Sequence, residues 1–167
     1  MEKVDSYKFV GGVTKRVVRT WIEMEEIRPI PWTPLSKPLS ECKVALLSSG
    51  GIALKTDQPF DQEGERQNPF WGDPSHRLIP ADATAEDIRV YHLHIDPRPA
   101  ETDLNCLLPV DRLRELAEEG LIGAAADWHY ATMGYILDPT ELLEVTTPKI
   151  TEHLKSQQVD ALILVPS

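Results

Sequence analysis

The stretch RVYHLHID, residues 89–96, places three residues that could do chemistry at every second position: His92, His94 and Asp96. Its apolar residues predict a β-strand, in which successive side chains point to opposite faces, so the two imidazoles and the carboxylate would share one face. That face needs polar partners, water or a ligand, because an apolar helix would leave its donors unsatisfied. The spacing suits a hydrogen-bonded polar face, a general acid–base site, or a divalent metal site. We favour the first two and assign no metal ligand.

Further polar residues cluster where loops meet the predicted strands. Asp96 and Asp127 come where two strands are expected to end, and ligands bind at the carboxyl ends of strands in open α/β sheets. The sequence therefore predicts a polar cleft between this edge and a long loop. Its other candidate residues are Asp73, Ser75, His76, Arg77, Asp103, Asn105, His129 and Tyr130.

Composition narrows the classes of function. The chain has 167 residues and a net charge of −10, which disfavours nucleic acid and anionic lipid as partners because phosphate contacts need clustered Lys and Arg. It contains no apolar run of about 18 residues, so no membrane span is expected. Only two cysteines occur, Cys42 and Cys106, and both are interpreted as small buried residues and not as nucleophiles. A cytoplasmic location is the simplest expectation.

The elements that must position these residues follow from hydrophobic period and from Pro and Gly signals. We expect strands at 42–51, 89–96, 121–127 and 159–167, helices at 14–26, 108–120, 137–145 and 146–158, and a long ordered loop over 56–87. Strands separated by helices predict an α/β fold with three layers, α/β/α (Rossmann-like), around a mostly parallel sheet. We predict one domain over residues 1–167, made of an N-terminal helix and Pro-rich arm (1–41) and a core (42–167).

Four segments resemble one known family. GDPSHRLIP, HLHID, DLNCLLPVDRLRELAEEGLIGAAADWHYATMGY and VDALILVPS resemble the B-subunit selenoprotein family of the glycine, sarcosine, betaine and D-proline reductases. The resemblance runs from Val44 to the C-terminus and is most specific from Asp103 to Gly134. It implies an α/β subunit that acts with partner subunits to cleave reductively the C–N bond of a small amino-acid-like substrate. It also implies a pyruvoyl cofactor on a separate partner subunit, with no cofactor in this chain, and an oligomeric assembly.

One part of the family pattern is absent. The family places a redox-active selenocysteine or cysteine after a buried strand, and ALILVPS resembles that strand, but the sequence stops at Ser167 before such a residue. The chain has no Cys-x-x-Cys motif, so no redox nucleophile is assigned. We expect the redox segment to follow Ser167 in a longer product or to lie on another chain. The remaining alternative is a family member that uses the pocket without this chemistry.

The resemblance also suggests roles for residues at family-like positions. We predict that His94 or His129 donates a proton to the leaving group, with His92 as a third catalytic candidate. Substrate-binding roles are predicted for a second set, in which the arginine clamps a carboxylate and the last two residues orient the substrate. These residues are Asp73, Ser75, Arg77, Asp103 and Asn105. Two other readings stay open, namely a metal-dependent hydrolase or lyase built on His92 and His94, and a non-catalytic ligand-binding or assembly protein.

Overall fold

The computed structural model describes residues 11–24, 29, 33–68 and 71–167, which fall into two compact units, residues 1–34 and 35–167. In the first unit, helix α1 (Gly12–Met24) confirms the predicted N-terminal helix as far as Met24. The last two residues predicted for that helix, and part of the Pro-rich arm, lie outside the described residues. The assignment of one domain to the whole chain stays a prediction.

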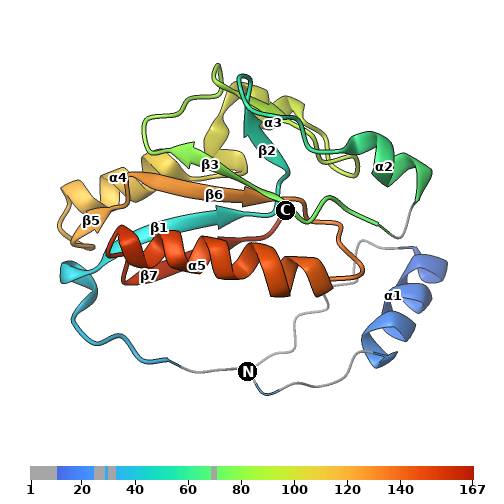
Figure 1. Ribbon diagram of the computed structural model, residues 1–167, viewed down its shortest axis with the longest axis horizontal. Helices are drawn as coiled ribbons and strands as arrows, with labels where there is room; N and C mark the ends of the chain where they lie inside the picture. The colour runs from blue at the N-terminus through green and yellow to red at the C-terminus, as the bar shows by residue number, and fades with distance from the viewer. Residues whose placement is uncertain (1–10, 25–28, 30–32, 69–70) are drawn as a thin grey trace. The chain divides into compact units, whose positions relative to one another are not determined.

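The second unit is built on a mostly parallel sheet, as predicted (Figure 1). Strand β1 pairs in parallel with β7 along one edge, and with β5 and then β6 along the other. β3 extends the sheet beyond β6 and runs antiparallel to it, with His76 opposite Thr132. The five strands are β1 (Lys43–Ser48), β3 (His76–Pro80), β5 (Ala124–Ala125), β6 (Trp128–Thr132) and β7 (Ala161–Val165).

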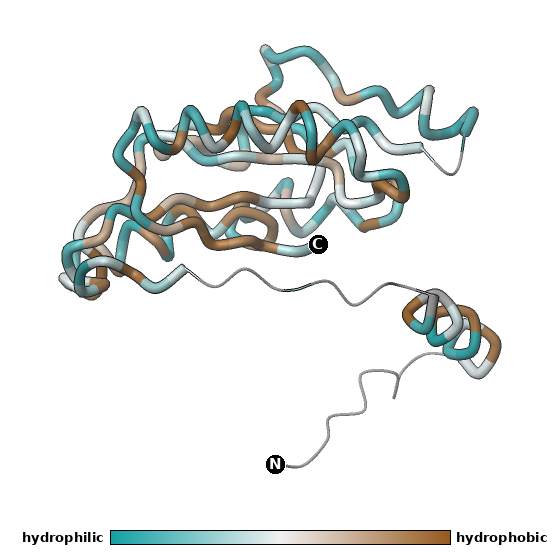
Figure 2. Tube along the Cα trace, turned by 60° about the horizontal axis from the view of Figure 1, so that its bottom comes forward, coloured by the Kyte–Doolittle hydropathy of each residue, from teal (hydrophilic) through white to brown (hydrophobic). Residues whose placement is uncertain are grey.

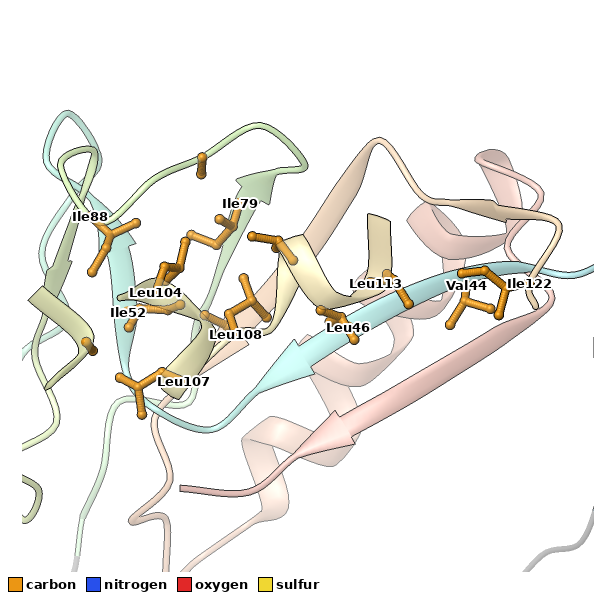
Figure 3. Close-up of a cluster of buried hydrophobic side chains, with 14 of the residues drawn as sticks. Val44, Leu46, Ile52, Ile79, Ile88, Leu104, Leu107, Leu108, Leu113 and Ile122 are labelled. Atoms are coloured by element: carbon orange, nitrogen blue, oxygen red, sulfur yellow. The ribbon is translucent and has the colours of Figure 1, made fainter. Parts of the chain in front are cut away.

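Helices cover both faces of this sheet, which confirms the three-layer α/β/α prediction. The side chains of β1 alternate: Val44 and Leu46 pack with Leu113 of α4 (Val110–Glu118) in one core cluster, drawn in Figure 3. Ala45 packs on the opposite face with Ile150 of α5 (Thr147–Ser156). Burial of both faces is typical of parallel sheets and explains the continuous apolar sequence of β1.

The remaining elements are short. They show that the segment over 56–87, predicted as an ordered loop, contains both a helix and the strand β3. The segments predicted as helices at 137–145 and 146–158 form one continuous helical run that includes a π-helical turn. These further elements are β2 (Ile52–Leu54), which pairs antiparallel with β4 (Ile88–Val90), the helices α2 (Gln62–Gln67) and α3 (Arg98–Thr102), the 3-10 turns η1 (Leu39–Glu41) and η2 (Leu104–Cys106), and the π-helical η3 (Leu142–Thr146).

The predicted strand over 89–96 is wrong beyond Val90. The N–H of Tyr91 still donates to the carbonyl of Gly51 (2.8 Å), but the chain then turns away from the small sheet. His92 closes this turn, because its Nδ1 accepts the N–H of His94 (3.1 Å). His92, His94 and Asp96 therefore do not share the face of a strand.

The predicted strand over 121–127 is also shorter than expected. Only Ala124 and Ala125 pair with β1, and the chain re-enters the sheet as β6 at Trp128. Asp127 consequently lies between β5 and β6 and not at a carboxyl end. The physical reason is that β5 and β6 share one edge of β1 in succession, so this part of the chain is divided between two short strands.

Candidate functional site

The carboxyl ends of three parallel strands meet at one edge of the sheet. The N–H of Ser49, just after β1, donates to the carbonyl of Val165 at the end of β7 (3.1 Å). The N–H of Gly51 donates to the carbonyl of Thr132 at the end of β6 (2.9 Å). Such an edge is where ligands bind in open α/β sheets.

The turn that carries His92 lies against this edge. A Cβ added at Gly134 would stand 2.8 Å from Nε2 of His92 and 2.7 Å from the carbonyl oxygen of Ser49. Only a glycine allows the imidazole to approach the backbone so closely. His92 is buried, and burial lowers its pKa, with the neighbouring imidazole of His94 as a smaller cause. A neutral His92 suits its role as acceptor for the N–H of His94.

His94 combines exposure with a buried carboxylate partner. Its Nε2 lies 3.1 Å from Oε1 of Glu65 in α2, and the two side chains are 54% and 2% exposed. Within the described residues, neither oxygen of Glu65 has a hydrogen-bond partner of good geometry. The imidazole of His94 is nevertheless within ion-pair distance of this buried carboxylate. The ring of Tyr135, in the loop after β6, packs against His94 with the ring centroids 4.7 Å apart. Glu65 and Tyr135 are thus additions to the predicted site.

The predicted substrate-binding residues of the long loop hold that loop together. Asp73 is buried and accepts the N–H groups of Asp61 and Ser75 (both 2.9 Å). The hydroxyl of Ser75 also donates to Asp73 and accepts from Nη1 of Arg77 (2.9 Å). Because Asp61 is in turn the N-cap of α2, this network fixes the helix that carries Glu65.

Most of the hydrogen bonds that the Arg77 guanidinium donates go to backbone carbonyls. Its guanidinium donates to the carbonyl oxygens of Gln58 (2.8 Å), Pro59 (3.0 Å) and His76 (2.8 Å), and lies 4.1 Å from the centre of the Phe60 ring. This geometry supports a loop-holding role for Arg77. Its assignment as a clamp for a substrate carboxylate stays a prediction.

Asp103 and Asn105 belong to a network at the start of α4. The carboxylate of Asp103 accepts the backbone N–H (3.0 Å) and the side-chain amide N–H (2.8 Å) of Asn105. The side-chain amide of Asn105 also donates to the carboxylate of Asp111 (2.8 Å), and its oxygen accepts the backbone N–H of Asp111 (3.0 Å). The hydrogen bond from Asn105 lowers the pKa of Asp111. Asp103 and Asp111 line a surface hollow of about 580 Å³ whose lining does not include His92 or His94. Their predicted substrate-orienting role stays a prediction.

His129 lies inside the protein. It is 1% exposed, and its Nδ1 accepts the backbone N–H of Leu46 (3.2 Å), at a point where β1 leaves β5 and has not yet joined β6. Burial lowers the pKa of His129 to about 4. These observations support a structural role, in which the ring takes the place of a missing strand partner, and the catalytic assignment of His129 stays a prediction.

The alternating arrangement of His92, His94 and Asp96, which the sequence analysis considered as one alternative for a metal site, does not form. Asp96 pairs with Arg98 (2.6 Å), and the rings of His92 and His94 have their centroids 5.8 Å apart. In the part of the chain that the structure describes, no three His, Cys, Asp or Glu side chains are placed to hold a metal ion. Cys42 is buried, as interpreted from the sequence, whereas Cys106 is exposed. No described helix has the length and apolar character needed to span a bilayer.

Comparison with known proteins gives one consistent result. The family glycine/sarcosine/betaine reductase selenoprotein B matches residues 9–167. D-proline reductase subunit gamma of Acetoanaerobium sticklandii is 38% identical over 139 residues, which cover 83% of this chain and 54% of that protein. Glycine reductase complex component B subunit gamma is 36% identical in Symbiobacterium thermophilum (81% of this chain, 30% of the relative) and 35% identical in Carboxydothermus hydrogenoformans (87% and 32%).

These relatives are components of reductase complexes, and this chain spans about half the length of the first and about a third of the other two. No solved structure matches the chain. The family match covers nearly the whole sequence and includes every strand and helix that forms the site described above. The chain belongs to the glycine/sarcosine/betaine reductase selenoprotein B family.

Proposed function

We propose that this chain forms the proton-donating side of a site that reductively cleaves the C–N bond of a small amino-acid-like substrate, within a multisubunit reductase. The observation that carries the proposal is the exposed imidazole of His94, in contact with the buried carboxylate of Glu65 at the carboxyl edge of the sheet. The names of the relatives support the reductase class.

The reaction needs a proton at a defined place. Reductive cleavage consumes two electrons and two protons, and it converts the C–N bond into a C–H bond and an N–H bond. A pair of thiol or selenol groups on partner polypeptides is the proposed source of the electrons and is oxidised in the process. Protonation of the nitrogen makes the departing group a neutral amine, and a general acid beside that nitrogen would lower the barrier.

His94 is the best placed of the three predicted histidines for this role. Its side chain is 54% exposed, whereas His92 and His129 are 9% and 1% exposed and use their Nδ1 atoms as acceptors for backbone N–H groups. The Glu65 carboxylate and the Tyr135 ring restrict the orientation of the His94 ring. When bound on a partner subunit, a pyruvoyl group would supply an electrophilic carbonyl for the substrate amine, and His94 would then serve the nitrogen that leaves.

The test is turnover by the complete reductase assembly that contains His94→Ala. We expect kcat to fall by about 100-fold or more, the range typical of a lost general acid. The matched control is His153→Gln, a half-buried residue of α5 whose ring forms a hydrogen bond with the hydroxyl of Tyr130 (3.0 Å). Glutamine can keep this hydrogen bond, so the control should leave kcat within about twofold. Unchanged turnover in His94→Ala would remove the acid–base assignment. An assembly that binds its partners but never turns over, even with the native sequence, would favour the assembly-protein alternative.

A further inference from the structure

The outer edge of β7 carries no partner strand among the described residues. β7 pairs with β1 along its whole length, from Ala161 opposite Val44 to Val165 opposite Ser48, and this uses one of its two edges. Ile163 is 46% exposed and Leu164 is 67% exposed. Because side chains alternate along a strand, these two residues project from opposite faces. Both faces of β7 are therefore incompletely covered.

The composition of β7 is typical of a strand in the middle of a sheet. Its sequence is ALILV, with no charge and no proline, and Figure 2 shows it as an apolar segment leading to the C-terminus. Native proteins protect free edges with Lys, Pro, bulges or a covering element, since a bare apolar edge pairs with other chains. Parallel strands are moreover buried on both faces. Leu162 and Val165 already pack on the two core clusters, and no strand of the described residues lies along the outer edge of β7.

The lengths of the relatives provide a candidate for that neighbour. They extend far beyond the region that this chain matches, by about as much again in one case and by twice as much in two others. We propose that the free edge of β7 is a docking site for a parallel β-strand, apolar on both faces, from a polypeptide segment equivalent to that unmatched region. Only the identity of the partner as a reductase polypeptide rests on the proposed function. The existence of the docking edge rests on β7 alone.

Docking at this edge would bring the partner to the candidate site. The N–H of Ser167 donates to Oγ of Ser49 (2.9 Å), so the end of β7 is fixed beside the Ser49 backbone that also borders Gly134 and His92. A parallel neighbour of β7 ends at the same edge of the sheet. The loop that follows the docked strand is then adjacent to Ser49 and His92, where it can contribute further groups to the candidate site.

The test uses the full chain in its native host with p-benzoylphenylalanine in place of Ile163. Irradiation should crosslink it to a polypeptide whose sequence matches the unmatched region of the relatives, as identified by mass spectrometry. The matched control places the same probe at Leu121, an exposed apolar position (53%) on the turn between α4 and β5, where this crosslink should not form. Leu164→Lys should reduce the crosslink at 163 by about tenfold, whereas Leu121→Lys should not.

Three results would overturn the docking site: a crosslink to a second copy of this chain, no crosslink at position 163, or an equal yield from position 121. Circular dichroism of Leu164→Lys separates lost docking from lost folding, and the crosslink at position 163 decides the matter even if that variant unfolds. The readout does not depend on turnover. A partner crosslinked at β7 together with an active His94→Ala assembly would refute the proposed function and leave the docking site intact.

Discussion

Replacing His129 with asparagine should reduce the loss in the free energy of unfolding that the protein undergoes as the pH falls below about 6.5. The side chain of His129 is 1% exposed, and its Nδ1 accepts the N–H of Leu46, so the ring is neutral and carries its proton on Nε2. Burial, with the positive charge of Arg114 as a second cause, lowers the pKa of His129 from 6.5 to about 4. An imidazolium at this position would lose its hydration and would direct a second N–H at the N–H of Leu46.

The magnitude follows from the two protonation equilibria. In the unfolded chain the same ring has the ordinary pKa of 6.5, so as the pH falls the unfolded state takes up a proton first. Above pH 6.5 both states are neutral and the contribution of a neutral His129 is complete. Between that pH and about 4 the free energy of unfolding falls as the pH falls. The difference of about 2.5 pH units, at about 1.4 kcal/mol each, amounts to about 3.5 kcal/mol.

Urea unfolding followed by circular dichroism, from about pH 7 to about pH 4.5, measures this loss. Asparagine keeps a carbonyl acceptor for the Leu46 N–H but does not titrate, so His129→Asn should lose about 2 to 3 kcal/mol less than the native protein over this range. The titrations of His76, His92 and the carboxylates occur in both proteins and cancel in the comparison. Parallel profiles for the two proteins would refute the assignment of His129 as a buried neutral acceptor.

Two further substitutions test the architecture of the site. Gly134→Ala should displace the His92 ring and lower the free energy of unfolding by about 1 to 3 kcal/mol, because the new Cβ would stand 2.7 Å from the Ser49 carbonyl; an unchanged imidazole NMR signal for His92 would contradict this packing. Arg77→Lys should cost about 1 to 2 kcal/mol of stability, because an ammonium cannot hold the carbonyls of Gln58 and Pro59 together. A raised KM with unchanged stability would instead identify Arg77 as a substrate clamp.

The parts of the fold that sequence reasoning predicted correctly are those with local signals. α4 has its apolar period, a proline before its first turn and Gly120 after its end, where the φ angle is +71°. β1 and β7 are continuous apolar runs of the length expected for buried parallel strands. Each of these features is decided within about ten residues, so it could be read without knowledge of the tertiary structure.

The parts that were missed depend on contacts between distant segments. HRLIP becomes β3 because it pairs with β6, some fifty residues later in the sequence. Five residues between two prolines are too short a segment to predict a strand from the sequence alone. The alternation in HLHID looks the same in a strand and in a turn, and the hydrogen bond from the His94 N–H to His92 decides for the turn. Glu65 looked like an ordinary solvent-exposed residue of a polar segment, and only the packing of α2 makes it a buried partner for His94. The sequence thus pointed to the histidines of the candidate site but not to the carboxylate that contacts one of them.

The antiparallel direction of β3 allows the segment that precedes it to vary in length. Because β3 runs antiparallel to β6, it begins rather than ends at the edge of the sheet where His92 lies, with His76 opposite Thr132. The preceding segment, residues 55–75, therefore enters the sheet from the side of the site and needs no crossover helix. Its length can change without altering the order of the strands or the cores on either face. Because the segment carries Glu65, a change in it alters the surroundings of His94 and leaves the rest of the scaffold as it is.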